Sequence, residues 1–427
     1  MKRILHTSRT LDERIVEGRH ESGLRVLICP KPELTGTYAL FGTRYGSIDT
    51  RFRRAGEPDF ADVPEGIAHF LEHKLFESED GDAFTRFAAT GASANAYTSF
   101  DRTCYLFFCS DRWEENLDIL LDFVRHPYFT EETVQKEQGI IGQEIRMYDD
   151  DPGWAVTFGL LQALYARHPV RINIAGTVES IAGIDADMLY RCYRTFYNPS
   201  NMFLCVAGPV DPDRILDKVD ALLKDEKGVT IERGVFEEPD GVVTSSVTRQ
   251  MAVAMPQFAL GYKETPDDGP LTSLRERVET DVLLRIVAGR SSRLYNDLLE
   301  RGLINDAFSA SFFTGHGYAV TLFEGESRDP EAVAAALEEE IGRLRREGID
   351  EEAFKRAKNS LYGQNVMMYN SVERIAGALA DCAMEGTDLF AVDEAYRAVT
   401  RRDLEERLKG RFDPGRRALS TVTPIKE

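Results

Sequence analysis

The 427-residue sequence has few cysteines, only two tryptophans and no long apolar run. Its six cysteines include no C-x-x-C pair, which argues against a disulfide-stapled fold and against a cysteine zinc knuckle. No stretch approaches the roughly 18 charge-poor apolar residues that a membrane helix needs. The N-terminal residues meet Arg9, Asp12, Glu13 and Arg14 before any apolar run begins, unlike a signal peptide. We therefore expect a cytoplasmic protein with buried, reduced thiols and no membrane segment.

An excess of positive charge is also absent. The chain has 52 lysines and arginines against 72 aspartates and glutamates, a net charge of −20. Such an acidic chain repels phosphate backbones, so nucleic acid is not an expected partner. Hydrophobic residues make up 43% and charged residues 29%, the values of an ordinary globular protein with a substantial core.

The order of predicted elements suggests two halves of similar length. Strand and helix signals alternate through the first half, and a similar order restarts with a strand near 250–262. Residues 225–245 are rich in glycine, proline and acidic residues, which is typical of a linker. We predict an N-terminal domain over 1–228, a linker over 229–245 and a C-terminal domain over 246–427. The similar order is compatible with an ancient duplication, although no residue-level repeat proves it.

The most informative segment is the motif H-x-x-E-H, formed by His69, Glu72 and His73 on a predicted helix over 64–77. Histidines at i and i+4 project from one helix face, so two imidazole nitrogens can reach one zinc ion. Glu72 shares that face and would stand beside the metal, where it can act on a bound water; this is the inverted H-E-x-x-H pattern. The alternative is a core helix with hydrogen-bonded histidines, but burying three polar side chains without a purpose is costly.

A third ligand must come from elsewhere in the chain. Glu77 would lie about 12 Å along the helix axis from His69, too far for one ion. On the predicted helix over 131–148, two glutamates interrupt an apolar stripe whose members are Val134, Glu137, Ile141, Glu144 and Tyr148. We predict Glu144 as the ligand and Glu137 as a supporting group on a histidine or near the water. The alternative is that this stripe faces solvent and that both glutamates are surface charges.

On these motifs the chain resembles the pitrilysin/insulysin family of inverted-motif zinc metallopeptidases, in its half-length bacterial branch. That branch includes relatives of the mitochondrial processing peptidase subunits. The run G-I-A-H-F-L-E-H-K-L-F-E resembles that of bacterial proteins linked to elongation factor P modification. The family's second glutamate helix follows about seventy residues after the motif, as Glu137–Ile145 does here. The resemblance implies an α+β fold of two similar domains, each a mostly antiparallel sheet packed with helices. It also implies one zinc ion per chain, held by His69, His73 and Glu144.

The resemblance assigns further residues and shows one departure. The segment 91–98 matches the family strand that pairs with substrate backbone, which implies substrate contacts at Asn95, Ala96 and Thr98. Active members carry an Arg–Tyr pair around a Gly-Leu dipeptide in the second domain. Here the aligned positions hold Leu298 and Asn305. Either a nearby residue, Tyr295 or Arg301, replaces the pair, or a second subunit supplies it.

These observations predict a zinc-dependent endopeptidase that acts on peptides or small unfolded proteins. Glu72 would be the general base and Glu137 would assist at the site. The protein would form a homodimer, or a heterodimer with a homologous subunit that carries the Arg–Tyr pair. One alternative is a non-catalytic or partner-dependent scaffold or maturation subunit that retains the zinc site. The other is a purely structural zinc protein, although no cysteine lies near His69.

Overall fold

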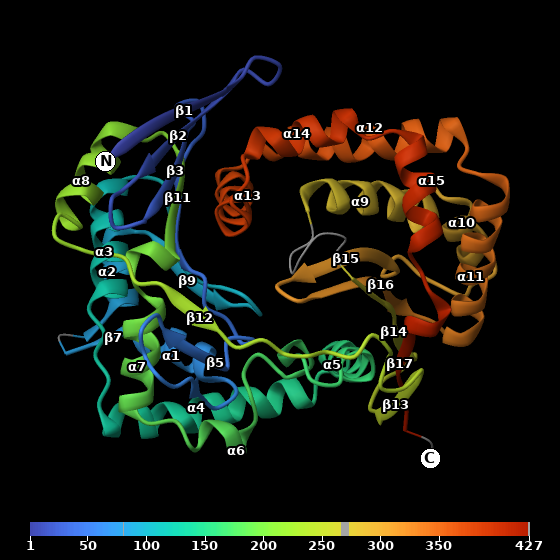
Figure 1. The fold of residues 1–427 in the computed structure, drawn as a ribbon, viewed down its shortest axis with the longest axis horizontal. Helices are drawn as coiled ribbons and strands as arrows, with labels where there is room; N and C mark the ends of the chain where they lie inside the picture. Colours follow the sequence, from blue (N-terminus) through green and yellow to red (C-terminus); the bar gives the residue numbers. More distant parts are fainter. Residues whose placement is uncertain (80, 266–272, 426–427) are drawn as a thin grey trace. The chain divides into compact units, whose positions relative to one another are not determined.

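The computed structural model describes residues 1–79, 81–265 and 273–425 (Figure 1). They form two compact units. Unit 1 comprises Met1–Ile145, Asn173–Val235 and Asn365–Ala391, and unit 2 comprises Arg146–Ile172, Phe236–Gln364 and Val392–Glu427. The expected linker 229–245 contains one passage between the units, at Val235 and Phe236. The units are nevertheless not sequential, so the predicted ranges 1–228 and 246–427 do not coincide with them.

Unit 1 is built on a seven-stranded sheet in the order β1-β2-β3-β11-β4-β10-β9. Only β3 and β11 pair in parallel, and every other neighbouring pair is antiparallel. All seven residues of β11 are buried, which fits its position inside the sheet. The strands are β1 (Lys2–Ser8), β2 (Glu13–Arg19), β3 (Arg25–Pro30), β4 (Thr37–Thr43), β9 (Ser93–Thr98), β10 (Thr103–Cys109) and β11 (Met202–Gly208).

Unit 1 also contains two small sheets and several helices. Strands β5 (Arg51–Arg54), β6 (Ala61–Asp62) and β12 (Ile231–Arg233) form a small sheet, and β7 (Glu77–Ser78) pairs with β8 (Gly81–Asp82). The helices are α1 (Ile67–Leu75), α2 (Ala83–Thr90), α3 (Trp113–Arg125), α4 (Glu131–Asp149), α6 (Val178–Ile181), α7 (Ala186–Phe196), α8 (Pro212–Leu222) and α13 (Val372–Glu385).

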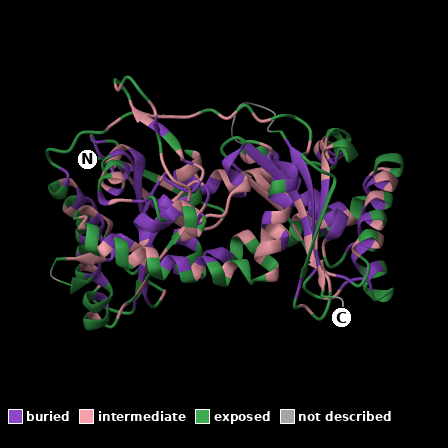
Figure 2. Ribbon diagram, turned by 90° about the horizontal axis from the view of Figure 1, so that it is seen from below, coloured by how far each residue is buried: buried purple, intermediate pink, exposed green. Residues whose placement is uncertain are grey.

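Unit 2 is built on a five-stranded sheet in the order β13-β17-β14-β16-β15. The strands are β13 (Ser246–Met251), β14 (Gln257–Glu264), β15 (Ser309–Gly315), β16 (Tyr318–Glu326) and β17 (Arg417–Pro424). The helices are α5 (Pro152–Leu164), α9 (Leu274–Ala288), α10 (Arg293–Glu300), α11 (Pro330–Glu347), α12 (Glu351–Met368), α14 (Leu389–Ala398) and α15 (Arg401–Gly410). Figure 2 shows that buried residues concentrate in the strands and in the helix faces against them.

The two sheets share one topology. Strands β3, β4, β9, β10 and β11 correspond in chain order to β13, β14, β15, β16 and β17, and the spatial orders match as well. The parallel pair β3–β11 corresponds to the parallel pair β13–β17, and the remaining pairs are antiparallel in both. The expected fold of two similar, mostly antiparallel α+β domains is therefore confirmed, and it supports a duplication.

One helix of each half packs on the sheet built by the other half. Helix α5, from the first half of the chain, packs on β13, β14 and β17, whereas α13, from the second half, packs on β3, β4 and β11. Gly261 of β14 permits the close approach of α5, because a Cβ there would lie 2.8 Å from a methyl carbon of Leu160. This exchange is why contiguous domain ranges do not describe the compact units.

Arginines of the unit 1 sheet hold the C-terminal end of α13. Arg25 donates to the carbonyls of Cys382 and Thr387, each at 3.0 Å, and Arg44 donates to the carbonyl of Ala383 at 2.7 Å. The last carbonyls of a helix lack intrahelical partners and carry partial negative charge, so guanidinium groups there satisfy both needs.

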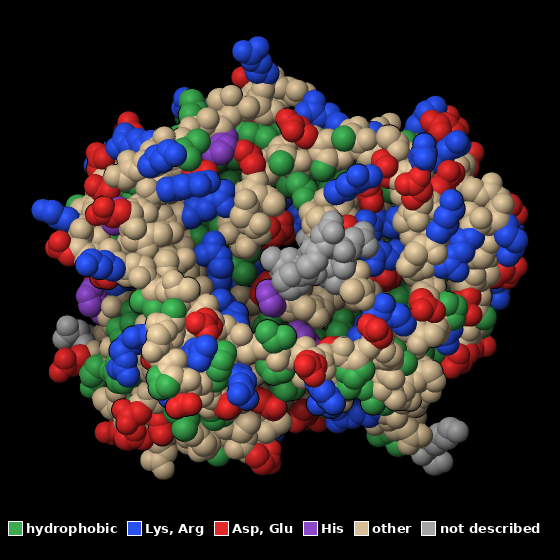
Figure 3. Space-filling model, in the orientation of Figure 1, with side chains coloured by type: hydrophobic (Ala, Val, Ile, Leu, Met, Phe, Trp, Pro, Cys, Tyr) green, Lys and Arg blue, Asp and Glu red, His purple; other side chains and the backbone are tan. Residues whose placement is uncertain are grey.

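The expectations drawn from composition concern thiols, membranes and charge. All six cysteines are unpaired and buried, as expected, and burial raises the pKa of the Cys104 thiol to about 12. Within the described residues, the helices are too short or too polar for a membrane span. Acidic and basic side chains are interspersed over the face shown in Figure 3.

Candidate metal centre and catalytic site

Helix α1 begins at a glycine that the local packing requires. Gly66 has φ +87°, and a Cβ there would lie 2.3 Å from the carbonyl oxygen of Ala175. The Ser180 hydroxyl of α6 donates to the carbonyl of Glu65 at 2.9 Å. The loop that contains Gly176 and Thr177 thus fixes the start of the helix that carries the H-x-x-E-H motif.

Helices α1 and α4 bring the three predicted ligands together. The rings of His69 and His73 have their centroids 4.6 Å apart. The Nε2 atoms of both histidines lie 3.5 Å from carboxylate oxygens of Glu144, one from each oxygen. One ligand atom from each residue lies within 4.8 Å of the others. The side chain of Glu144 is 21% exposed and that of Glu137 13%, so the glutamate stripe of α4 faces α1 rather than solvent.

This donor set suits zinc. Two imidazole nitrogens and one carboxylate, with a fourth position left open, are typical of catalytic zinc sites. Within residues 1–79, 81–265 and 273–425, His69, His73 and Glu144 are the only group of candidate metal ligands. The group has three members, whereas a structural zinc site usually has four protein ligands. Glu77 forms an ion pair with Lys74 instead, in agreement with its exclusion.

Glu137 supports one of the two histidines. Its Oε1 lies 3.0 Å from Nδ1 of His73, which leaves Nε2 directed at the candidate metal position. Burial opposes protonation of this ring, but the hydrogen bond to Glu137 and the nearby carboxylates of Glu72 and Glu144 raise the pKa of His73. By contrast, Nδ1 of His69 is buried and has no hydrogen-bond partner among the described residues.

Glu72 lies beside the candidate ligands and is held by a threonine. Only 7% of Glu72 is exposed, and burial raises the pKa of its carboxyl group, although the His69 charge partly opposes this. The Thr98 hydroxyl donates to Oε2 of Glu72 at 2.7 Å. Thr98 also lies 3.3 Å from the Thr103 hydroxyl, which donates to the carbonyl of Tyr45 at 2.9 Å. The hydrogen bond from Thr98 leaves the other Glu72 oxygen available.

Strand β9 forms one edge of the unit 1 sheet, because among the described strands it pairs with β10 alone. Asn95 is exposed and Ala96 partly exposed on this strand. The side-chain oxygen of Asn95 accepts from the Ala96 amide at 2.9 Å. The predicted substrate contacts at Asn95 and Ala96 thus lie on a free edge, whereas the Thr98 hydroxyl is directed at Glu72. The motif did not reveal this link, because it joins a helix to a strand 26 residues later.

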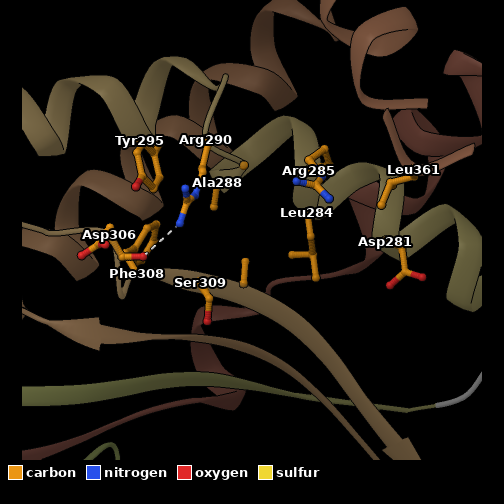
Figure 4. A pocket seen from close by; sticks show the side chains of 12 residues that line it. Asp281, Leu284, Arg285, Ala288, Arg290, Tyr295, Asp306, Phe308, Ser309 and Leu361 are labelled. Atoms are coloured by element: carbon orange, nitrogen blue, oxygen red, sulfur yellow. Dashed lines mark hydrogen bonds between the residues drawn. The ribbon is translucent and has the colours of Figure 1, made fainter. Parts of the chain in front are cut away.

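The residues aligned with the Arg–Tyr pair are committed to other contacts. Leu298 is fully buried in the core of unit 2, and the Asn305 amide donates to Glu326 at 2.8 Å. Of the two suggested replacements, Arg301 pairs with Asp297 at 2.9 Å. Tyr295 is only 6% exposed and lines a pocket of about 300 Å³ between α9, α10 and β15 (Figure 4).

That pocket lies beside the helix of unit 2 that follows β14, as α1 follows β4 in unit 1. This helix, α9, contributes Asp281, Leu284 and Arg285 to the pocket. Arg285 donates to the Gln364 side chain of α12 at 3.1 Å. A guanidinium group cannot bind a cation, so these positions do not form a second zinc site.

Two family models match the chain. The model described as insulinase, peptidase family M16, matches residues 60–178, and the model described as the peptidase M16 inactive domain matches residues 183–361. The first match contains all the candidate ligands. The second contains the α9 segment that lacks them.

Relatives match over nearly the whole length. YmfH of Bacillus subtilis, described as an uncharacterized zinc protease, is 41% identical over 422 residues that cover 97% of both chains. The crystal structure of an M16-like peptidase from Alicyclobacillus acidocaldarius has a TM-score of 0.92 at 36% identity and covers 97% of this chain and 99% of its own. Pitrilysin shares the fold with a TM-score of 0.77 at 16% identity, and the match spans 47% of its chain. The chain therefore belongs to the insulinase family of peptidases, family M16, as a half-length member of the pitrilysin type.

Proposed function

We propose that this chain is a zinc-dependent endopeptidase that cleaves peptides or small unfolded proteins. One observation carries the proposal: His69, His73 and Glu144 converge on a single point, and the buried carboxylate of Glu72 lies beside them. The zinc protease descriptions of relatives such as YmfH support the choice of metal. One zinc ion per chain is expected.

Zinc held by these three side chains would polarise the scissile carbonyl and lower the pKa of a water at the open position towards about 7. Glu72 accepts the proton of the attacking water and delivers it to the leaving amine. The Thr98 hydroxyl fixes one oxygen of Glu72, so the other stays directed at the water. Glu137 keeps the His73 ring in the tautomer that offers Nε2.

The substrate binds as an added strand. The outer edge of β9 offers backbone groups to an extended peptide, and backbone pairing suits a peptidase that accepts many sequences. Asn95 and Ala96 would lie along that peptide. Pairing along β9 leads it towards Thr98 and the carboxylate of Glu72.

A second subunit completes the site in this proposal. Leu298 and Asn305 cannot grip a substrate carbonyl, and their side chains are already buried or bonded. Loss of one oxyanion-stabilising donor typically lowers the rate by about 10²–10³. We infer that a homologous subunit, or a second copy of the chain, supplies donors. The unpaired thiols are consistent with action in the cytoplasm.

The same departure favours a second candidate function. A partner-dependent scaffold or maturation subunit could retain the zinc site and have no turnover of its own. Leu298 and Asn305 favour this candidate, whereas the intact Glu72 and its bond to Thr98 favour catalysis.

The decisive experiment compares the zinc-loaded wild type with Glu72→Gln on a panel of unfolded peptides, with and without a co-expressed homologue that carries the Arg–Tyr pair. Glu72→Gln should keep its zinc and lose roughly 10²–10⁴ in turnover. Glu132→Gln, at an exposed glutamate of α4 that has no ion pair or hydrogen bond with a described residue, is the matched control and should cleave like the wild type. Zinc binding without turnover in either state would support the scaffold.

A further inference from the structure

A second pocket of unit 2, of about 200 Å³, is lined by four arginines from four different elements. They are Arg285 of α9, Arg293 at the start of α10, Arg343 of α11 and Arg356 of α12. Ser291 and the carboxylates of Glu340 and Asp350 also line it. The pocket shares no residue with the metal centre, which lies in unit 1.

One of the four arginines is neutralised within the chain. Arg343 binds both carboxylate oxygens of Glu340, at 2.9 and 2.7 Å, and an oxygen of Glu347 at 2.8 Å. These carboxylates raise the pKa of the Arg343 guanidinium far above its usual range. Arg343 and Glu340 therefore form a wall of the pocket that has little net charge.

The other three guanidinium groups form no ion pair with a described carboxylate, although Asp281 one turn earlier on α9 interacts electrostatically with Arg285. Arg293 and Arg356 are exposed, and neither has a hydrogen bond or ion pair with any residue that the structure describes. Arg285 donates to the neutral amide of Gln364. The single remaining carboxylate, Asp350, accepts from the Ala353 amide at 2.8 Å at the start of α12. The pocket thus has an excess of positive charge in a chain whose net charge is −20.

The remaining lining indicates the kind of anion. The uncharged side chains, including Ile286, Leu344, Ala353 and Ala357, include no aromatic ring on which a base could stack. Ser291 offers a hydroxyl one residue before Ser292, the N-cap of α10, and the first-turn amides of that helix favour negative charge. Guanidinium groups match tetrahedral oxyanions through paired N–H donors. The volume exceeds that of a phosphate group with a few waters, at about 30 Å³ per water.

We propose that this pocket binds the phosphate group of a small anionic ligand. Arg293 and Arg356 are the principal charge partners, and Arg285 and Ser291 provide further hydrogen bonds. None of these residues belongs to the group of candidate metal ligands.

The test is calorimetric titration of the zinc-loaded protein with inorganic phosphate and with pyrophosphate, at fixed ionic strength. The double variant Arg293→Gln/Arg356→Gln should bind at least roughly tenfold more weakly than the wild type. The control Arg9→Gln/Arg191→Gln removes the same charge from exposed positions of unit 1 and should bind like the wild type. Tighter binding of pyrophosphate would indicate that the ligand carries a diphosphate. Equal binding of the two anions would indicate that it carries a single phosphate group.

Three results would overturn the proposal. They are the absence of saturable binding of either anion to the wild type, equal affinity in the Arg293/Arg356 double variant, and an equal loss in the unit 1 control. Any anion bound at zinc contributes equally to all three proteins, so the comparison isolates the pocket. Circular dichroism of the double variant checks its fold, and Arg293→Lys/Arg356→Lys, which keeps the charge, should recover part of the affinity.

Discussion

At the scale of single residues, the local pattern of the motif carries most of the chemistry. Histidines at i and i+4 and a glutamate at i+3 share one face of any α-helix, so their grouping follows from the sequence. The contact between Thr98 and Glu72 does not follow in this way, because it depends on how β9 lies against α1. In the proposed mechanism, Thr98 is a positioning residue for the general base Glu72.

Replacement of Thr98 tests this role. Thr98→Val removes the donor to Glu72 and keeps the shape of the side chain, so it should lower kcat about tenfold or more while KM changes little. Thr98→Ser retains the hydroxyl and should recover most of the activity. Equal losses in Val and Ser variants, with zinc content unchanged, would mean that the hydroxyl does not act through Glu72.

A buried histidine outside the metal centre makes the stability of unit 2 depend on pH. His168 accepts from the Val170 amide at Nδ1 and contacts the His316 carbonyl through Nε2, both at 3.1 Å, so the neutral ring fits its site. Burial lowers the pKa of His168 to about 4, against about 6.5 in an unfolded chain.

Because the folded pKa is the lower one, the unfolded chain binds the extra proton first as the pH falls. The contribution of neutral His168 to the free energy of unfolding is complete above about pH 6.5. As the pH falls from about 6.5 to 4, the free energy of unfolding decreases by up to roughly 2–3 kcal/mol. Urea unfolding at pH 7 and pH 5 should show this loss in the wild type and a smaller loss in His168→Gln. His126→Gln, at an exposed histidine, is the control and should lose as much unfolding free energy between pH 7 and pH 5 as the wild type. An equally large loss in His168→Gln would contradict the account.

At the scale of elements, the sequence predicts which helices and strands form better than it predicts which sheet each helix covers. The residues of α5 are apolar nearly all round, which is typical of a buried helix, and the motif predicts that α1 and α4 meet. Neither pattern states which sheet α5 covers, because its apolar face would fit either of two similar sheets. The exchange of α5 and α13 is a tertiary property, so contiguous ranges such as 1–228 and 246–427 cannot express it.

The exchange predicts that the halves depend on each other to fold. A fragment of residues 1–235 lacks α13, and a fragment of residues 236–427 lacks α5, so each exposes one face of its sheet. Helix α13 alone buries Val372, Ile375 and Leu379, each contributing about 1.5–3 kcal/mol. We expect each fragment alone to aggregate or to show little amide protection in β11 or β17, and the co-expressed pair to form a soluble one-to-one complex. A monomeric, protected fragment 1–235 would contradict this.

At the scale of the whole molecule, duplication and divergence explain where the chemistry lies. Both sheets have the same strand order, yet α1 carries His69, Glu72 and His73, whereas α9 lines its pocket with Asp281, Leu284 and Arg285. One copy of the fold thus carries the candidate metal centre, and the other carries two pockets with arginines. The sequence could suggest the repeated order of elements, but the pairing of β3 with β11 and of β13 with β17 needed the structure.

The most direct measurement of the central claim is the zinc content of the purified chain after dialysis against a weak chelator. The wild type should retain about one zinc ion per chain, and Glu144→Gln should lose most of it, because an amide oxygen is a poorer ligand than a carboxylate. Glu132→Gln, which alters an exposed glutamate of α4 outside the cluster, should retain zinc like the wild type. A wild type that holds no zinc even after resupply, or a Glu144→Gln variant that retains it fully, would contradict the assignment of His69, His73 and Glu144 as the metal centre.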